Sequence, residues 1–204
     1  MEQVLQIVTE RPLHYHPHIP RPDLHRAELV AATGKLLRRR GYSGTTVSDF
    51  LEAAGAANGS LYHHFPGGKE ELAGAAIEAA AEQVEASLLR AFDETDDVVL
   101  AIQRSIDGMI AAFEADPRDG CPVAPTAVDA AGISEPLREA AAAAFARWSQ
   151  VFERALALTR DSETAAAQAR VLLSAIEGAL LLDRTSHSTR HLEALRDAVP
   201  TLLA

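Results

Sequence analysis

Apolar residues recur at intervals of three and four along most of this chain, and this spacing constrains the fold more than any other feature. Glycine and proline interrupt the pattern, and no stretch shows the strict alternation of a half-buried strand. We therefore predict an all-α protein without internal repeats. The expected helices cover residues 23–40, 47–54, 58–65, 69–92, 97–115, 125–131, 135–159, 162–185 and 189–202.

Proline content and the positions of the expected helices divide the chain into three regions. Residues 1–22 contain four prolines and are expected to form an extended arm. Residues 23–68 form a small three-helix domain, and residues 69–204 a larger helical domain. His14, His16 and His18 alternate in the arm, where a solvated tail is favoured over a metal site because no preformed cage holds them. A minor-groove contact by Arg11 and Arg21 is the alternative role for the arm.

Charge and cysteine content exclude several classes of protein. Residues 1–69 hold 8 Lys and Arg against 6 Asp and Glu, a net charge of +2, whereas residues 70–204 hold 11 against 23, a net charge of −12. An acidic body orients the weakly basic end toward a polyanion. A single cysteine, no signal peptide and no apolar run of about 18 residues indicate a cytoplasmic protein without internal disulfides or a membrane span.

Two short helices joined by a turn with glycine follow the first helix, which is the layout of a helix-turn-helix domain. Leu61 and Phe65 lie four residues apart and would anchor the second short helix to the other two. The side of that helix which is expected to face solvent, and to fit a major groove about 12 Å wide, carries Asn58, Gly59, Ser60, Tyr62 and His63.

The local motifs strengthen this interpretation. The segments GYSGTTV (41–47), AAG (53–55), GSLYHHF (59–65) and KEEL (69–72) resemble the DNA-binding domain of the TetR family of transcriptional regulators. The segments PGGKEEL (66–72), GCPV (120–123) and EGALLL (177–182) are similar to the LmrA/YxaF-like branch. The resemblance implies a homodimeric regulator, usually a repressor, that binds a palindromic DNA operator and has a helical ligand-binding domain.

Roles at the DNA follow from the resemblance as hypotheses. Phosphate contacts fix the register of such a domain and base contacts discriminate between sequences. The residues assigned to DNA are Thr45, Thr46, Asn58, Gly59, Ser60, Tyr62, His63, His64 and Lys69. One departure concerns Ala57, which stands where the family usually has a serine that caps the recognition helix. Either the helix starts without a side-chain cap, or Asn58 caps it one residue later.

The large domain is expected to bind a small, largely apolar or aromatic effector and to dimerise. The candidate pocket residues are Met109, Phe113, Cys121, Phe145, Trp148, Phe152, Ile176 and Glu177. Helices 135–159 and 162–185 are expected to form a four-helix bundle with a second copy. The candidate interface residues are Phe145, Phe152, Leu156, Leu173 and Leu180.

Several residues allow a second interpretation. Cys121 is favoured as a structural cysteine over a redox sensor, and Glu177 can contact either a ligand or the dimer partner. Residues 38–40, three arginines at a helix end, are favoured as compensation of the helix dipole over a nucleic-acid patch. No catalytic, metal or cofactor site is expected, which disfavours an enzyme or a metal carrier. An architectural DNA-binding protein without an effector stays the other alternative.

Overall fold

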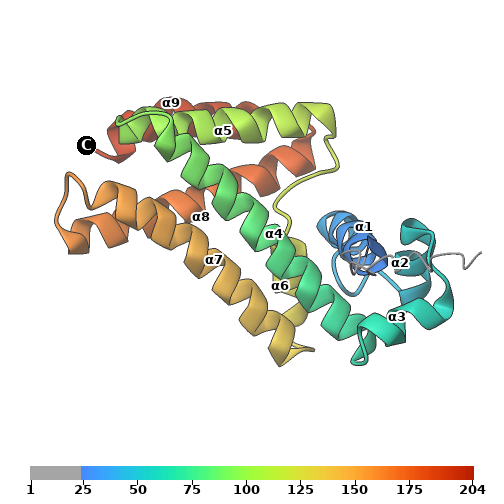
Figure 1. Cartoon of the computed structure of the whole chain (residues 1–204). Helices are drawn as coiled ribbons and strands as arrows, with labels where there is room; N and C mark the ends of the chain where they lie inside the picture. Colours follow the sequence, from blue (N-terminus) through green and yellow to red (C-terminus); the bar gives the residue numbers. More distant parts are fainter. Residues whose placement is uncertain (1–23) are drawn as a thin grey trace, which may run out of the picture.

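The computed structural model describes residues 24–204, and this part of the chain is built from helices without strands, as predicted (Figure 1). A small N-terminal unit contains α1 (Leu24–Arg40), α2 (Val47–Ala54) and α3 (Asn58–His64). The larger unit contains α4 (Gly68–Asp93), α5 (Val98–Ala115), α6 (Ala124–Ala130), α7 (Glu135–Leu156), α8 (Ser162–Ser186) and α9 (Arg190–Leu202). The predicted arm and Asp23 lie outside the described residues.

Local sequence signals set the ends of these helices. The side chains of Asp97 and Asp161 accept hydrogen bonds from the first backbone amides of α5 and α8. Gly41 and Gly55 follow α1 and α2 with φ angles of 70° and 62°, a left-handed backbone that glycine adopts without steric cost. These positions agree with the predicted boundaries to within a few residues.

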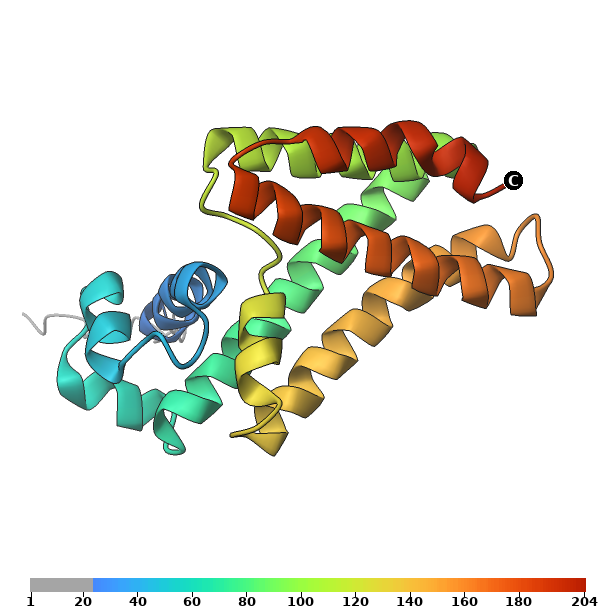
Figure 2. The ribbon, with the colours of Figure 1, turned by 180° about the vertical axis from the view of Figure 1, so that it is seen from behind.

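The long helix α4 connects the two units. It starts beside α3, packs against α1 and α7, and reaches the layer formed by α5 and α9 at the far end of the molecule (Figures 1 and 2). The small unit also contacts the large one through α1 and α6. Because α1 touches both α4 and α6 and also packs against α3, its position depends on the large unit.

The core of the large unit corrects part of the predicted dimer interface. Phe152 and Leu156 are almost fully buried within a single chain, with exposed fractions of 1% and 0%. The reason is that α7 packs against α4 on one side and α8 on another, so both side chains fill the space inside the chain's own fold. These two residues are therefore unavailable to a partner subunit, whereas Phe145, Leu173 and Leu180 are only partly buried.

Three large apolar side chains of α8 are exposed to solvent. These are Val171, Leu181 and Leu182, with Leu181 exposed to 63%. By length and composition α8 would also fit a membrane span, although 28% of its most apolar window is buried inside the chain. Several exposed apolar side chains on one helix favour an interaction surface.

Candidate nucleic-acid interface and ligand cavity

The helix that precedes the recognition helix is fixed by a capping box. The Thr46 hydroxyl accepts a hydrogen bond from the Asp49 amide at 3.2 Å, and the Asp49 carboxylate accepts one from the Thr46 amide at 2.7 Å. Hydrogen bonds from Thr46, with a smaller contribution from nearby Arg40, lower the pKa of Asp49. This pair fixes the start of α2 where the sequence predicted it, and Thr46 itself stays exposed there.

The recognition helix α3 is anchored on one side and open on the other. Leu61 and Phe65 are completely buried, which confirms their predicted role as anchors. Tyr62 is exposed to 61%, and Gly59 and His63 are also exposed. Ser60 and His64 are half-buried, with the His63 and His64 rings edge to face at 4.7 Å. The face predicted to meet DNA therefore points outward from the small unit.

The structure decides between the two predicted starts of α3. The helix begins at Asn58, with Ala57 at the capping position and no side-chain hydrogen bond to the free amides. The Ser60 amide donates instead to the Ala57 carbonyl at 2.9 Å. The first turn of α3 therefore lacks a capping side chain, and its free amides stay available to an acceptor such as a phosphate.

Two residues assigned to DNA are engaged inside the protein. Thr45 is buried, and its hydroxyl donates to the carbonyls of Gly41 and Tyr42, so its assignment as a DNA contact is wrong. The Lys69 ammonium donates to the Tyr42 carbonyl at 2.8 Å and lies 4.0 Å from the centre of the Tyr42 ring. Burial lowers the pKa of Lys69. This residue holds the turn after α1 against α4, and its contact with phosphate stays a prediction.

The large unit contains a cavity of about 410 Å³ between α4, α5, α7 and α8. This volume lies within the usual range for small-molecule sites. The predicted residues on its wall are Met109, Phe113, Cys121, Trp148, Phe152, Ile176 and Glu177. Phe145 is the exception, because it packs edge to face against Trp148 at 5.4 Å and does not line the cavity. The Trp148 indole nitrogen donates to the Ala81 carbonyl at 3.1 Å, which fixes this ring in the wall.

A half-buried acid and a buried thiol meet at this wall. Burial raises the pKa of Glu177 to about 7, an effect that the neighbouring Cys121 side chain partly offsets. The pKa of Cys121 is raised, first by burial and then by the charge of Glu177. Its sulfur accepts hydrogen bonds from the amides of Val123 and Ala124 at 3.4 and 3.3 Å. A thiol held protonated in this way supports the structural role of Cys121 over that of a nucleophile.

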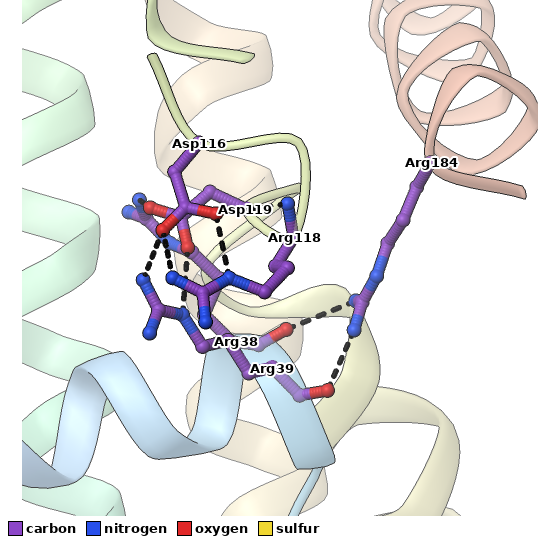
Figure 3. Close-up of polar contacts among 6 residues, drawn as sticks. All are labelled: Arg38, Arg39, Asp116, Arg118, Asp119 and Arg184. Atoms are coloured by element: carbon purple, nitrogen blue, oxygen red, sulfur yellow. Dashed lines mark hydrogen bonds and ion pairs between the residues drawn. The ribbon is translucent and has the colours of Figure 1, made fainter. Parts of the chain in front are cut away.

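The loop between α5 and α6 holds the end of α1 (Figure 3). Arg38 lies 3.3 Å from Asp119, while Arg39 lies 3.1 Å from Asp119 and 2.6 Å from Asp116. From α8, Arg184 donates to the carbonyls of Arg38 and Arg39 at 3.0 and 2.6 Å. We call these five residues the α1 clamp. Hydrogen bonds from Arg118, followed by the charges of Arg118 and Arg39, lower the pKa of Asp116.

The α1 clamp gives the arginines at the end of α1 a role that sequence reasoning missed. Their position beside the last carbonyls of a helix does compensate the dipole. In addition, Arg38 and Arg39 form ion pairs with residues about 80 positions further along the chain. Arg40 pairs with Asp49 instead, at 3.3 Å.

Metal binding finds no support in the described part of the chain. Within residues 24–204, no group of three or more His, Cys, Asp or Glu side chains is placed to hold an ion. The adjacent His63 and His64 do not belong to such a group. His14, His16 and His18 lie outside the described residues.

Comparison with known proteins decides the family. Residues 29–76 match the family described as bacterial regulatory proteins of the tetR family. Residues 98–198 match the C-terminal domain of LmrA/YxaF-like transcriptional regulators. The HTH-type transcriptional regulator LmrA of Bacillus subtilis is 33% identical over 180 residues, which covers 87% of this chain and 96% of the relative. The chain belongs to the TetR family.

Further relatives agree with this assignment. The regulator YxaF of Bacillus subtilis is 34% identical over 180 residues, covering 87% of this chain and 94% of the relative. A TetR regulator from Legionella pneumophila has the same fold, with a TM-score of 0.78 at 22% identity and coverage of 85% of this chain and 94% of that one. The all-α fold with an N-terminal helix-turn-helix unit is therefore confirmed. The protein is a DNA-binding transcriptional regulator and not an enzyme.

Proposed function

We propose that this TetR-family regulator is a homodimeric repressor that leaves a palindromic operator when a small, largely apolar or aromatic effector binds the cavity of the large unit. DNA binding and dimerisation are general in the family. The repressor role, the dimer of this chain and its effector form the proposal. A protein of this kind acts in the cytoplasm, where its operator lies.

The observation that carries the proposal is a loop shared by the cavity and the small unit. Asp119, Gly120 and Cys121 line the cavity. Asp119 also belongs to the α1 clamp, through which Arg38 and Arg39 are held (Figure 3). An effector that displaces this loop therefore acts on α1, which packs directly against α3.

Gly120 strengthens the link between the cavity and α8. A Cβ atom at this position would lie 3.4 Å from Cδ of Arg184, so the loop passes directly beside this side chain. Because Arg184 binds the last carbonyls of α1, movement of the loop or of α8 changes the support of the same helix end. To release DNA, the effector must bind the DNA-free arrangement more tightly than the DNA-bound one.

The DNA-facing side of the proposal rests on α3. Its exposed residues Gly59, Tyr62 and His63 stand on the side opposite to the buried anchors Leu61 and Phe65. Thr46 and the half-buried Ser60 and His64 complete the face, with Asn58 at its first helical position. Lys69, at the start of α4, stays among the residues proposed to contact DNA. Thr45 is removed from them because it is buried.

The dimer of the proposal uses α7 and α8 with their symmetry mates. Val171, Leu181 and Leu182 replace Phe152 and Leu156 as the expected contacts, because they are exposed along one side of α8. Phe145 is partly buried and remains at the margin, whereas the partly buried Leu173 and Leu180 line the cavity. A two-fold axis through such a bundle would present two copies of α3 to DNA about one helical turn, or 34–36 Å, apart.

A gel shift on the DNA upstream of the protein's own gene tests this proposal. The full chain should retard this fragment and not an unrelated fragment of equal length. Compounds that raise the melting temperature of the protein should then release the fragment. A reporter driven by the same DNA should become more active when the gene is deleted, whereas decreased activity would indicate an activator. An architectural protein would retard the fragment, and no compound that raises its melting temperature would release it.

A further inference from the structure

Glu177 is an acid without a countercharge in the wall of the cavity. It lies on α8, is half-buried, and borders both the 410 Å³ cavity and a second one of about 550 Å³ between α1, α6 and α8. The thiol of Cys121, which lines the same two cavities, is kept neutral by its raised pKa. No cation of the described residues lies within ion-pair distance of its carboxyl group.

The other acids of the same cavity are already paired. Asp119 lies 3.3 Å from Arg38 and 3.1 Å from Arg39, and Glu94 lies 3.9 Å from Arg104. Asp119 and Glu177 are both half-buried and Glu94 is exposed, so Glu177 differs from the other two acids in lacking a cation among residues 24–204. A buried carboxylate that lacks a cation is costly, and the cost disappears if a ligand supplies the missing positive charge.

None of the charged groups that the structure describes around Glu177 pairs with its carboxyl group, so the missing positive charge is left for a ligand to supply. Those lining the two cavities are Arg38, Arg39, Arg40, Arg90, Glu94, Arg104, Asp119, Asp129 and Arg184. The arginines of α1 are held by acids of the loop and of α2, and Arg184 is held by backbone carbonyls. Asp129 accepts a hydrogen bond from the Ser43 amide at 2.9 Å. None of these contacts involves the carboxyl group of Glu177.

We propose that Glu177 determines the effector class and selects an amphiphilic organic cation, whose ammonium group pairs with Glu177 and whose apolar body lies against Met109, Phe113 and Trp148. This inference rests on the proposed effector function of the cavity. A ligand of about a dozen non-hydrogen atoms fits a space of 410 Å³. Glu177 is only half-buried, and a bound ligand would displace water from its carboxyl group and so strengthen the charged pair.

A matched set of ligands tests the charge requirement. Phenylbutylamine, phenylbutanol and phenylbutyrate share one apolar body and carry a positive, neutral or negative end. Trp148 is the only tryptophan of the chain and lines the cavity, so its fluorescence reports binding of compounds that do not absorb in its range. We expect the amine to bind about tenfold or more tighter than the alcohol at pH 8, and phenylbutyrate to bind most weakly.

The pH dependence gives a second readout. An alkylammonium stays protonated between pH 6 and pH 8, because such groups have pKa values of about 10. Only the ionised form of Glu177 pairs with it, and with a pKa of about 7 the ionised fraction rises about tenfold over this range. The affinity for phenylbutylamine should therefore rise about tenfold from pH 6 to pH 8, while the affinity for phenylbutanol stays constant.

Two variants separate the buried acid from general electrostatics. Glu177→Gln should bind the amine and the alcohol with similar affinity and show no pH dependence, while its affinity for the alcohol stays within about twofold of the wild type. Glu94→Gln removes an equal charge from the edge of the same cavity and should keep both the preference and the pH dependence. Folding of each variant is checked by its melting transition.

Three results would overturn the inference. These are equal binding of amine and alcohol by the wild-type protein, pH dependence that persists in Glu177→Gln, and failure of all three ligands to change Trp148 fluorescence. Retardation of the upstream DNA fragment by the same preparation would show that the regulator function stands even then. Loss of both activities would count against the proposed function itself.

Discussion

Replacing Glu177 by glutamine should stabilise the protein at pH 8 much more than at pH 5. The carboxyl group has an ordinary pKa of 4.5, and burial raises this pKa to about 7 in the folded chain. The folded state therefore holds the proton more tightly than the unfolded state does. Its contribution to stability is complete below pH 4.5 and is lost as the pH rises through 7. Glutamine is neutral at every pH and loses nothing.

The size of the effect follows from the two pKa values. A rise from 4.5 to about 7 corresponds to about 3 kcal/mol in all, most of which falls between pH 5 and pH 8. The unfolding free energy of Glu177→Gln, minus that of the wild type, should increase by about this amount over that range. Other titrating groups cancel because both proteins contain them.

Urea unfolding followed by circular dichroism measures this difference at each pH. One fixed protein concentration is used throughout, because dimerisation would make the apparent stability depend on concentration. Glu94→Gln is the matched control, since Glu94 is exposed and paired with Arg104, and its difference should stay nearly constant with pH. Parallel curves for wild type and Glu177→Gln would refute the statement that Glu177 is buried without a countercharge.

Three further expectations concern the other parts of the molecule. Tyr62→Ala should weaken operator binding about tenfold in a gel shift without lowering the melting temperature, whereas Lys69→Ala should lower both, because it also loses its bond to the Tyr42 carbonyl; unchanged affinity in both variants would count against the assigned face. Leu181→Glu places a charge on the exposed side of α8 and should yield monomers in analytical ultracentrifugation, and a stable dimer would move the interface elsewhere. Asp119→Asn should speed amide exchange in the last turn of α1, measured by mass spectrometry, and wild-type rates there would show that Asp119 does not hold the helix.

Local patterns in the sequence were enough to predict the helices and the recognition unit. The capping pair of Thr46 and Asp49 and the glycines at 41 and 55 act within a few residues of where they stand. Leu61 and Phe65 follow the period of a single helix, so their burial could be inferred without knowing the fold. Seven of the eight residues predicted for the pocket do line the cavity, because apolar residues of long helices line the space between them, but the part of the wall formed by α4 was missed.

What the sequence did not show depends on the packing of distant segments. Phe152 and Leu156 belong to an apolar face that fits a dimer seam as well as a core, and only the position of α4 places them in the core. Thr45 was assigned to DNA from the sequence, but in the structure its hydroxyl donates to carbonyls of the turn after α1.

The α1 clamp was missed for the same reason. Arginines 38 and 39 and the acids at 116 and 119 are visible as opposite charges, yet a single sequence does not show that they pair. Arg184 is still harder to predict, because it binds backbone carbonyls and not an acid.

Footprinting on the DNA upstream of the gene tests the central claim most directly. If two copies of α3 meet the duplex through the exposed Tyr62 face, hydroxyl radicals should reveal two protected half-sites on one side of the DNA, about one helical turn apart. Tyr62→Ala at the same concentration should leave both half-sites open. A single protected patch, or protection that the variant retains in full, would contradict this account.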